Sequence, residues 1–104
     1  MAAFKLTLDA EHDLLGIAIY TVETWGLAQA DRYEADLVRH FEGLGRGDVR
    51  TSTPISRRPE LQASRCLHHY VFSLHDEKKA PLILAMLHEK MDLMTRLAER
   101  LGAD

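Results

Sequence analysis

The residues with the clearest chemical potential lie in LHEKMD, residues 87–92, where a histidine is followed directly by a glutamate. A zinc-protease helix carries two histidines one turn apart, with a glutamate between them as the base. Here Asp92 stands where the second histidine is needed, so the turn offers at most the pair His88 and Asp92. A third ligand would have to come from the distant segment Cys66–His69. We therefore expect no metal site, and interpret His88 as the end of a buried strand and Asp92 as an acid that caps the following helix.

Other catalytic arrangements are equally poorly supported. The adjacent His68 and His69 titrate near neutral pH, but neighbouring side chains on a strand point to opposite faces, so we expect one ring packed and one exposed. Cys66, the single cysteine, has no recognisable activating neighbour and is more simply a buried side chain. The chain has no Gly-x-Ser-x-Gly elbow, and GLGRG, residues 43–47, lacks the strand and the Lys-Ser/Thr of a phosphate-binding loop. These residues predict neither a catalytic centre nor a cofactor.

Composition is that of a folded globular protein. The chain has 104 residues, of which 46% are apolar and 28% charged, so we expect residues 1–104 to form a single domain. No apolar run is long enough for a membrane helix, and the first residues lack the pattern of a signal peptide. A single cysteine fits a reducing compartment. We expect a cytoplasmic protein with no membrane partner.

Charge is unevenly distributed around a net value of -3. Residues 9–42 carry eight acids against Arg32 and Arg39, a local balance of -6. Residues 46–65 carry five arginines against Asp48 and Glu60, a local balance of +3. The basic segment either meets an acidic partner or is simply solvated.

The first half of the chain reads as a short strand followed by two helices. FKLTL, residues 4–8, alternates apolar and polar side chains, which is typical of a strand. From Asp9, a suitable N-cap, apolar residues recur three or four apart and predict a helix that stops near Gly26. A second stripe over Leu27–Leu44 predicts another helix, antiparallel to the first because the link is short. The glycines of residues 43–47 then end it, and two prolines hold the following segment in a loop.

The second half reads as three strands and a helix. Residues 61–66 and 69–75 are rich in strand-forming side chains, although no turn residue separates them. DEKKAP, residues 76–81, predicts a polar turn, and the continuously apolar LILAML, residues 82–87, predicts a central strand. A last helix is expected over residues 91–101. Together these elements predict an α+β fold: a strand, an antiparallel two-helix hairpin packed on one face of a small antiparallel sheet, three further antiparallel strands and a short C-terminal helix.

Three large apolar side chains are open to two interpretations. Trp25, Met91 and Met94 lie at helical spacing from other apolar residues, which is typical of core positions. The alternative is an exposed surface for a partner. We favour the core.

Taken in order, these segments resemble the ParE branch of the ParE/RelE toxins of bacterial type II toxin-antitoxin systems, of the plasmid-stabilisation type. DLLGIAIYTVETWGLAQADRYEADLVRHFEGL, residues 13–44, is similar to the family's acidic first helix, its Tyr-Thr-x-x-x-Trp-Gly joint and its Gln-Ala-x-x-Tyr second helix. HYVF, residues 69–72, and LILAMLHEKMD, residues 82–92, are similar to its later strands and its Leu-His-x-x-Met-Asp ending. Residues 73–74 are Ser-Leu where the family often has Tyr-Arg, and Ala85 stands where it often has an arginine.

The resemblance implies the same fold and a toxin without catalytic residues. It further implies that the toxin traps DNA gyrase on DNA, and that a ParD-like antitoxin neutralises it through a disordered segment that folds on binding. No cofactor, and no direct sequence-specific binding of nucleic acid by the toxin alone, is implied.

Two alternatives stay open. The RelE-like branch cuts messenger RNA in the ribosome, which needs a base, a cation for the phosphate and an acid. All three tyrosines here precede the last strand, and an acidic chain is poorly suited to gripping ribosomal RNA. The other alternative is an interaction module whose toxicity has been lost.

We predict that basic and neighbouring residues of the second half contact the antitoxin or the target. They are Arg57, Arg58, Arg65, His69, His88, Lys90 and Met91.

Overall fold

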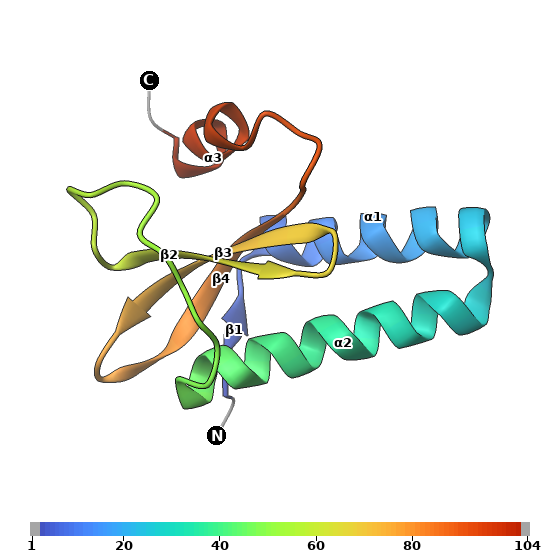
Figure 1. Ribbon diagram of the computed structural model, residues 1–104, viewed down its shortest axis with the longest axis horizontal. Helices are drawn as coiled ribbons and strands as arrows, with labels where there is room; N and C mark the ends of the chain where they lie inside the picture. Colours follow the sequence, from blue (N-terminus) through green and yellow to red (C-terminus); the bar gives the residue numbers. More distant parts are fainter. Residues whose placement is uncertain (1–2, 103–104) are drawn as a thin grey trace.

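The computed structural model describes residues 3–102 and has the predicted order of elements (Figure 1). The α+β class, with a strand, two helices, three strands and a final helix, is confirmed. None of the helices in residues 3–102 is long and apolar enough to cross a membrane. The elements are β1 (Lys5–Leu6), α1 (Leu8–Trp25), α2 (Leu27–Arg46), β2 (Leu61–Cys66), β3 (His69–Asp76), β4 (Lys79–His88) and α3 (Leu93–Leu101).

The sheet has four strands in the order β1-β4-β3-β2. β2, β3 and β4 are antiparallel, as predicted, and β4 is central. β1 runs parallel to β4, with Lys5 opposite Leu82 and Leu6 opposite Ile83, so the sheet is mixed and the expectation of a purely antiparallel sheet is wrong. The parallel pairing arises because α1 and α2 carry the chain across one face of the sheet before it returns.

β4 begins earlier than predicted. The predicted polar turn is present but confined to residues 77–78, and the strand starts at Lys79, so the predicted bounds of 76–81 are wrong. Pro81 lies inside the strand, which is possible because an extra residue on β4 shifts the register between Leu74 and Asp76 of β3. A bulge of this kind relieves proline of the ladder hydrogen bond that it cannot donate.

The helix ends also differ from the prediction. Thr7, not Asp9, caps α1, because its hydroxyl accepts a hydrogen bond from the Ala10 amide at 3.0 Å. α2 continues through Gly43 and Gly45 and ends at Gly47, whose φ of 77° closes a left-handed cap. A Cβ at Gly43 would lie 2.8 Å from a Val49 methyl, so this glycine permits close packing and does not end the helix.

Both faces of the sheet are covered. Side chains alternate between faces along a strand, so the adjacent Val71 and Phe72 of β3 belong to different cores. The core under the α1–α2 hairpin consists of Ala10, Leu37, Phe41, Leu44, Cys66, Val71, Ile83 and Met86. The core under α3 consists of Leu61, Ala63, Phe72, Ala85, Leu87 and Leu97.

Three residues predicted to be core are exposed. Trp25 is 70%, Met94 52% and Met91 46% exposed, so the core interpretation is wrong for all of them. The hairpin projects beyond the sheet (Figure 1), which leaves Trp25 at its tip without a layer to cover it. Met91 precedes α3, and Met94, one turn before the buried Leu97, lies toward solvent at the edge of the packed side of that helix.

Candidate binding surfaces

The seven predicted contact residues fall into two groups. Five gather where the β2–β3 turn meets the end of β4: Arg65, His69, His88, Lys90 and Met91. The other two, Arg57 and Arg58, lie in the loop before β2, facing α3.

The first group surrounds three histidines, His68, His69 and His88, which we call the histidine cluster. His69 lies directly opposite His88 in the sheet, and their rings meet edge to face with centroids 5.2 Å apart. His68 stacks on His88 with centroids 6.5 Å apart. As predicted, His69 is partly buried and His68 exposed. The expectation that the two residues are neighbours on one strand is wrong, because His68 lies in the turn, and the His88 ring lies beside both histidine rings.

Tyr33 of α2 holds the cluster against the helical hairpin. Its hydroxyl accepts a hydrogen bond from the His68 amide at 3.2 Å and lies 2.7 Å from Nδ1 of His69, to which it can donate its own hydrogen. Burial, aided by the neighbouring His88 and His68, lowers the pKa of His69 to about 4. Burial also raises the pKa of Tyr33. Both groups therefore stay neutral at physiological pH.

The turn that carries His68 is strained. Leu67 has a φ of 56°, which is unfavourable for a residue with a branched side chain, and it is 48% exposed. The turn is held by hydrogen bonds from the Arg65 side chain to the Leu67 carbonyl at 3.0 Å and from the Glu89 amide to the His68 carbonyl at 2.9 Å. Arg65 also forms an ion pair with Glu89. Strain of this kind is often retained at functional sites, which marks the turn as a candidate contact.

The segment after β4 completes the first group. The amide of Lys90 donates to Nδ1 of His88 at 3.1 Å, and the amide of Met91 donates to the His88 carbonyl at 3.0 Å. Asp92 then caps α3 by accepting from the Thr95 amide at 3.3 Å, as predicted. Within residues 3–102, no three His, Cys, Asp or Glu side chains are placed to hold a metal ion.

The second group lines a shallow groove of about 230 Å³ between the loop before β2 and α3, which we call the arginine groove. Its floor is apolar, and Arg57 and Arg58 stand exposed at its edge. Arg58 pairs with Glu60 at 3.3 Å, with both side chains about half exposed. The apolar floor consists of Ile55, Met94, Leu97, Ala98 and Leu101. An apolar segment with acidic residues would fit this combination of floor and edge.

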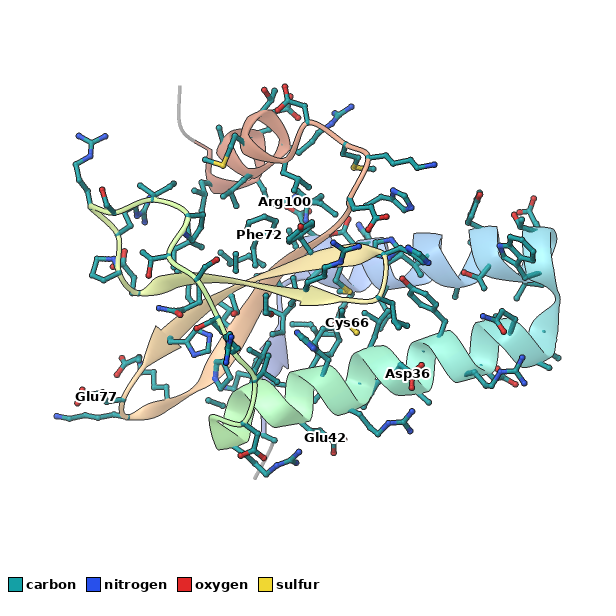
Figure 2. All side chains as sticks on the ribbon, in the orientation of Figure 1. Asp36, Glu42, Cys66, Phe72, Glu77 and Arg100 are labelled. Atoms are coloured by element: carbon teal, nitrogen blue, oxygen red, sulfur yellow. The ribbon has the colours of Figure 1, made fainter. Side chains whose placement is uncertain are left out.

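Two buried titratable groups near the histidine cluster, His69 and Cys66, have pKa values far from neutral. An acid or base works best when its pKa lies near the operating pH. Here burial moves the pKa of His69 down to about 4 and that of the Cys66 thiol up to about 11. Cys66 is buried on the side of the sheet that faces α2 (Figure 2) and behaves as the core side chain that was predicted. Neither of these two groups is suited to exchange a proton near neutral pH.

Several residues of these surfaces are absent from the prediction. Tyr33 reads in the sequence as one more member of an apolar helical stripe, and Glu89 as the base of a failed zinc motif. The apolar floor of the arginine groove has no sequence signal, because it joins the loop before β2 to a helix far along the chain. The two adjacent histidines are the one available sign that this end of the sheet is unusual.

A two-helix hairpin on one face of a four-stranded sheet, with two candidate contact surfaces, defines a small α+β protein of the strand-helix-helix-sheet type. A solved structure described as the chromosomal ParDE TA system from P. aeruginosa has the same fold, with a TM-score of 0.68 over 85% of this chain and 96% of that one, at 18% identity. The protein named Toxin ParE from Escherichia coli is 46% identical over 101 residues, which are 97% of this chain and 98% of that protein. The chain belongs to the ParE toxin family. No protein-family model matches the sequence.

Proposed function

We propose that this protein is the toxin of a type II toxin-antitoxin pair, that it acts in the cytoplasm by binding DNA gyrase without catalysing a reaction, and that a ParD-like antitoxin neutralises it. The observation that carries the proposal is the 46% identity to a ParE toxin over nearly the whole length of both chains. The fold shared with a ParDE toxin-antitoxin system is consistent with it.

The geometry of the histidine cluster supports action by binding. His69 is neutral and tied to Tyr33, and Arg65 is engaged by Glu89. Cleavage of RNA in the manner of the RelE-like branch needs a group that exchanges a proton near neutral pH and a cation free for the phosphate. The pairings of His69 and Arg65 oppose such a role for these two residues.

The gyrase proposal is tested by expressing the toxin without an antitoxin. Growth should stop with DNA-damage signalling, and gyrase should be recovered in covalent cleavage complexes with DNA. Intact DNA together with arrested translation and new cut sites in messages, mapped by primer extension, would establish the RelE-like alternative instead. Unimpaired growth with retained antitoxin binding would identify a module that has lost its toxicity.

The arginine groove is the proposed docking site for the flexible antitoxin segment. The double substitution R57E/R58E should weaken antitoxin binding by about tenfold or more, because it turns the edge of the groove from attractive to repulsive for acidic residues. The double substitution R46E/R50E is a matched control, since both arginines are exposed and neither lines the groove. Titration calorimetry with the purified antitoxin measures both. Equal losses for the two variants would show that only overall charge matters.

A further inference from the structure

The outer face of α1 is apolar although no part of the described chain covers it. Leu8, Leu15, Ile19 and Val22 are 66%, 59%, 51% and 40% exposed. Their spacings of seven, four and three residues place them in one stripe along the helix. The buried side of α1, which includes Ala10 and Thr21, points toward the sheet and α2. α1 is therefore apolar on two opposite sides, as expected of a helix packed between two partners.

Further exposed apolar side chains lie toward the tip of the hairpin. Trp25 and Tyr20 of α1 and Leu27 of α2 are each 65% exposed or more. This part of the hairpin projects beyond the sheet (Figure 1), so no strand lies against it. Seven of the ten large apolar side chains that the described part of the chain exposes lie on α1 or at this tip. Such a concentration of exposed apolar side chains marks an interaction site more often than a solvated face.

Gly16 gives an independent reason to expect a partner here. It lies in the middle of α1, next to Leu15 and one turn before Ile19, where glycine is unfavourable for a helix. A Cβ built at Gly16 would have nothing within 4 Å, and its φ is not in the region that requires glycine. Packing within residues 3–102 therefore does not explain this glycine. A glycine on an apolar helix face allows a second backbone to approach closely.

The charge of α1 indicates what kind of partner fits. The helix contains four acids and neither lysine nor arginine. Asp13 and Asp9 face Arg100, at 2.7 Å and 3.9 Å. Glu11, one turn before Leu15, and Glu23, one turn after Ile19, are exposed beside the stripe. A second copy of α1 would bring acids against acids, and an anionic membrane surface would repel them.

We propose that the outer face of α1 docks an amphipathic helix of another protein, with an apolar stripe that crosses at Gly16 and with lysine or arginine on its flanks opposite Glu11 and Glu23. The occupant differs from the acidic segment proposed for the arginine groove, because the two surfaces have opposite charge. The inference goes beyond the proposed function and depends on neither gyrase nor the antitoxin.

Three designed 18-residue helical peptides test the proposal on the full-length protein by fluorescence anisotropy. The first has a leucine stripe flanked by lysines, the second the same stripe flanked by glutamates, and the third the lysine flanks with serines in the stripe. The lysine-leucine peptide should bind at least about tenfold more tightly than either of the others, because both apolar contact and opposite charge are needed. Equal binding of the lysine-leucine and glutamate-leucine peptides would overturn the proposal.

Substitutions on the protein locate the binding. L15S/I19S should weaken binding of the lysine-leucine peptide by about tenfold, since both side chains are about half exposed and can be replaced without opening the core. L67S/M94S, which changes two equally exposed side chains elsewhere, should leave the affinity unchanged. Loss of affinity in both double variants, or in neither, would overturn the assignment to α1.

Gly16→Ala distinguishes a docking role from a merely tolerated glycine. Alanine should raise the melting temperature by about 2 to 5 °C, because it favours the helix, and yet weaken peptide binding several-fold by obstructing the crossing point. Unchanged peptide affinity would show that the partner helix does not pack closely against Gly16. Sedimentation of the free protein completes the test. If the protein is a dimer and L15S/I19S makes it a monomer, the occupant of this face is a second copy of the chain and the proposed partner is wrong.

Discussion

Arg100 reaches back from α3 to α1 and to β4, and Figure 2 shows it between α3 and the sheet. Its guanidinium donates to both carboxylate oxygens of Asp13, at 2.7 Å and 3.0 Å, and to the Leu84 carbonyl at 3.0 Å. Asp13 also accepts from the Met86 amide at 3.1 Å. The register of β3 and β4 shifts at Leu84, so its carbonyl takes side-chain donors. Arg100 thus donates a hydrogen bond to the Leu84 carbonyl at the bulge and, through its ion pair with Asp13, links α3 to α1.

Replacing Arg100 by alanine should lower the free energy of unfolding by about 2 to 4 kcal/mol, because the largely buried Asp13 carboxylate loses its cationic partner and the Leu84 carbonyl loses the shorter of its two side-chain hydrogen bonds. Arg96→Ala is the matched control on the same helix. Its pair with Glu99, at 3.5 Å, is exposed, so the change should stay within about 0.5 kcal/mol. Urea unfolding measures both, and equal losses would contradict the role given to Arg100.

His69 should make stability depend on pH. Its pKa falls from an ordinary 6.5 to about 4 in the folded state, so only the unfolded chain takes up a proton between these values. Stability is therefore full above pH 6.5 and is lost as the pH falls toward 4. The loss from His69 should be about 1 to 2 kcal/mol, less than the whole shift because the ring is partly exposed. His40 and His75, whose pKa values burial also lowers, act in the same direction.

Chemical denaturation at pH 7.5 and pH 5 measures this dependence. His69→Gln removes the titrating ring and should reduce the difference between the two pH values. His12→Gln alters an exposed histidine of α1 and serves as the control. If His69→Gln leaves the pH dependence unchanged, other groups than His69 cause the loss of stability at low pH.

At the scale of elements, α3 acts as the cover of the second core. Leu97 is fully buried against the sheet, whereas Met94, one turn earlier, is 52% exposed at the arginine groove. Leu97→Ala should lower the free energy of unfolding by about 2 to 4 kcal/mol through lost burial and the cavity that remains. Met94→Ala should change it by less than about 1 kcal/mol. Equilibrium unfolding in urea decides, and a small effect at Leu97 would mean that α3 contributes little to the core.

At the scale of the whole molecule, the two cores share one sheet. Val71 and Phe72 are neighbours on β3, and loss of either core would expose the other side of the same strand. We expect a single cooperative unfolding transition. Trp25 fluorescence, from the hairpin tip, and far-ultraviolet circular dichroism should therefore give the same midpoint, in wild type and in both Leu37→Ala and Leu97→Ala. Separate midpoints in either variant would show that the cores unfold independently.

Local patterns in the sequence were sufficient for most of the elements. The helical spacing of apolar residues and the stop at Gly26 gave the hairpin, and β2 has the predicted bounds. Errors arose where a distant contact overrides a local preference. Gly43 stays inside α2 because Val49 packs against it, and Pro81 stays inside β4 because a bulge against β3 accommodates it. Trp25 is exposed because the sheet does not extend to the hairpin tip.

The sequence by itself determined the order of elements, the α+β class and the family resemblance, because each depends on residues close together along the chain. Only the tertiary structure decided which side chains share a surface. The pairing of β3 with β4 sets His69 beside His88, and the packing of α2 on the sheet brings Tyr33 to them. The fold likewise left the outer face of α1 uncovered. The spacing of apolar residues shows that a helix has an apolar side. Whether that side is buried depends on which other elements pack against it, and this is set by the tertiary structure.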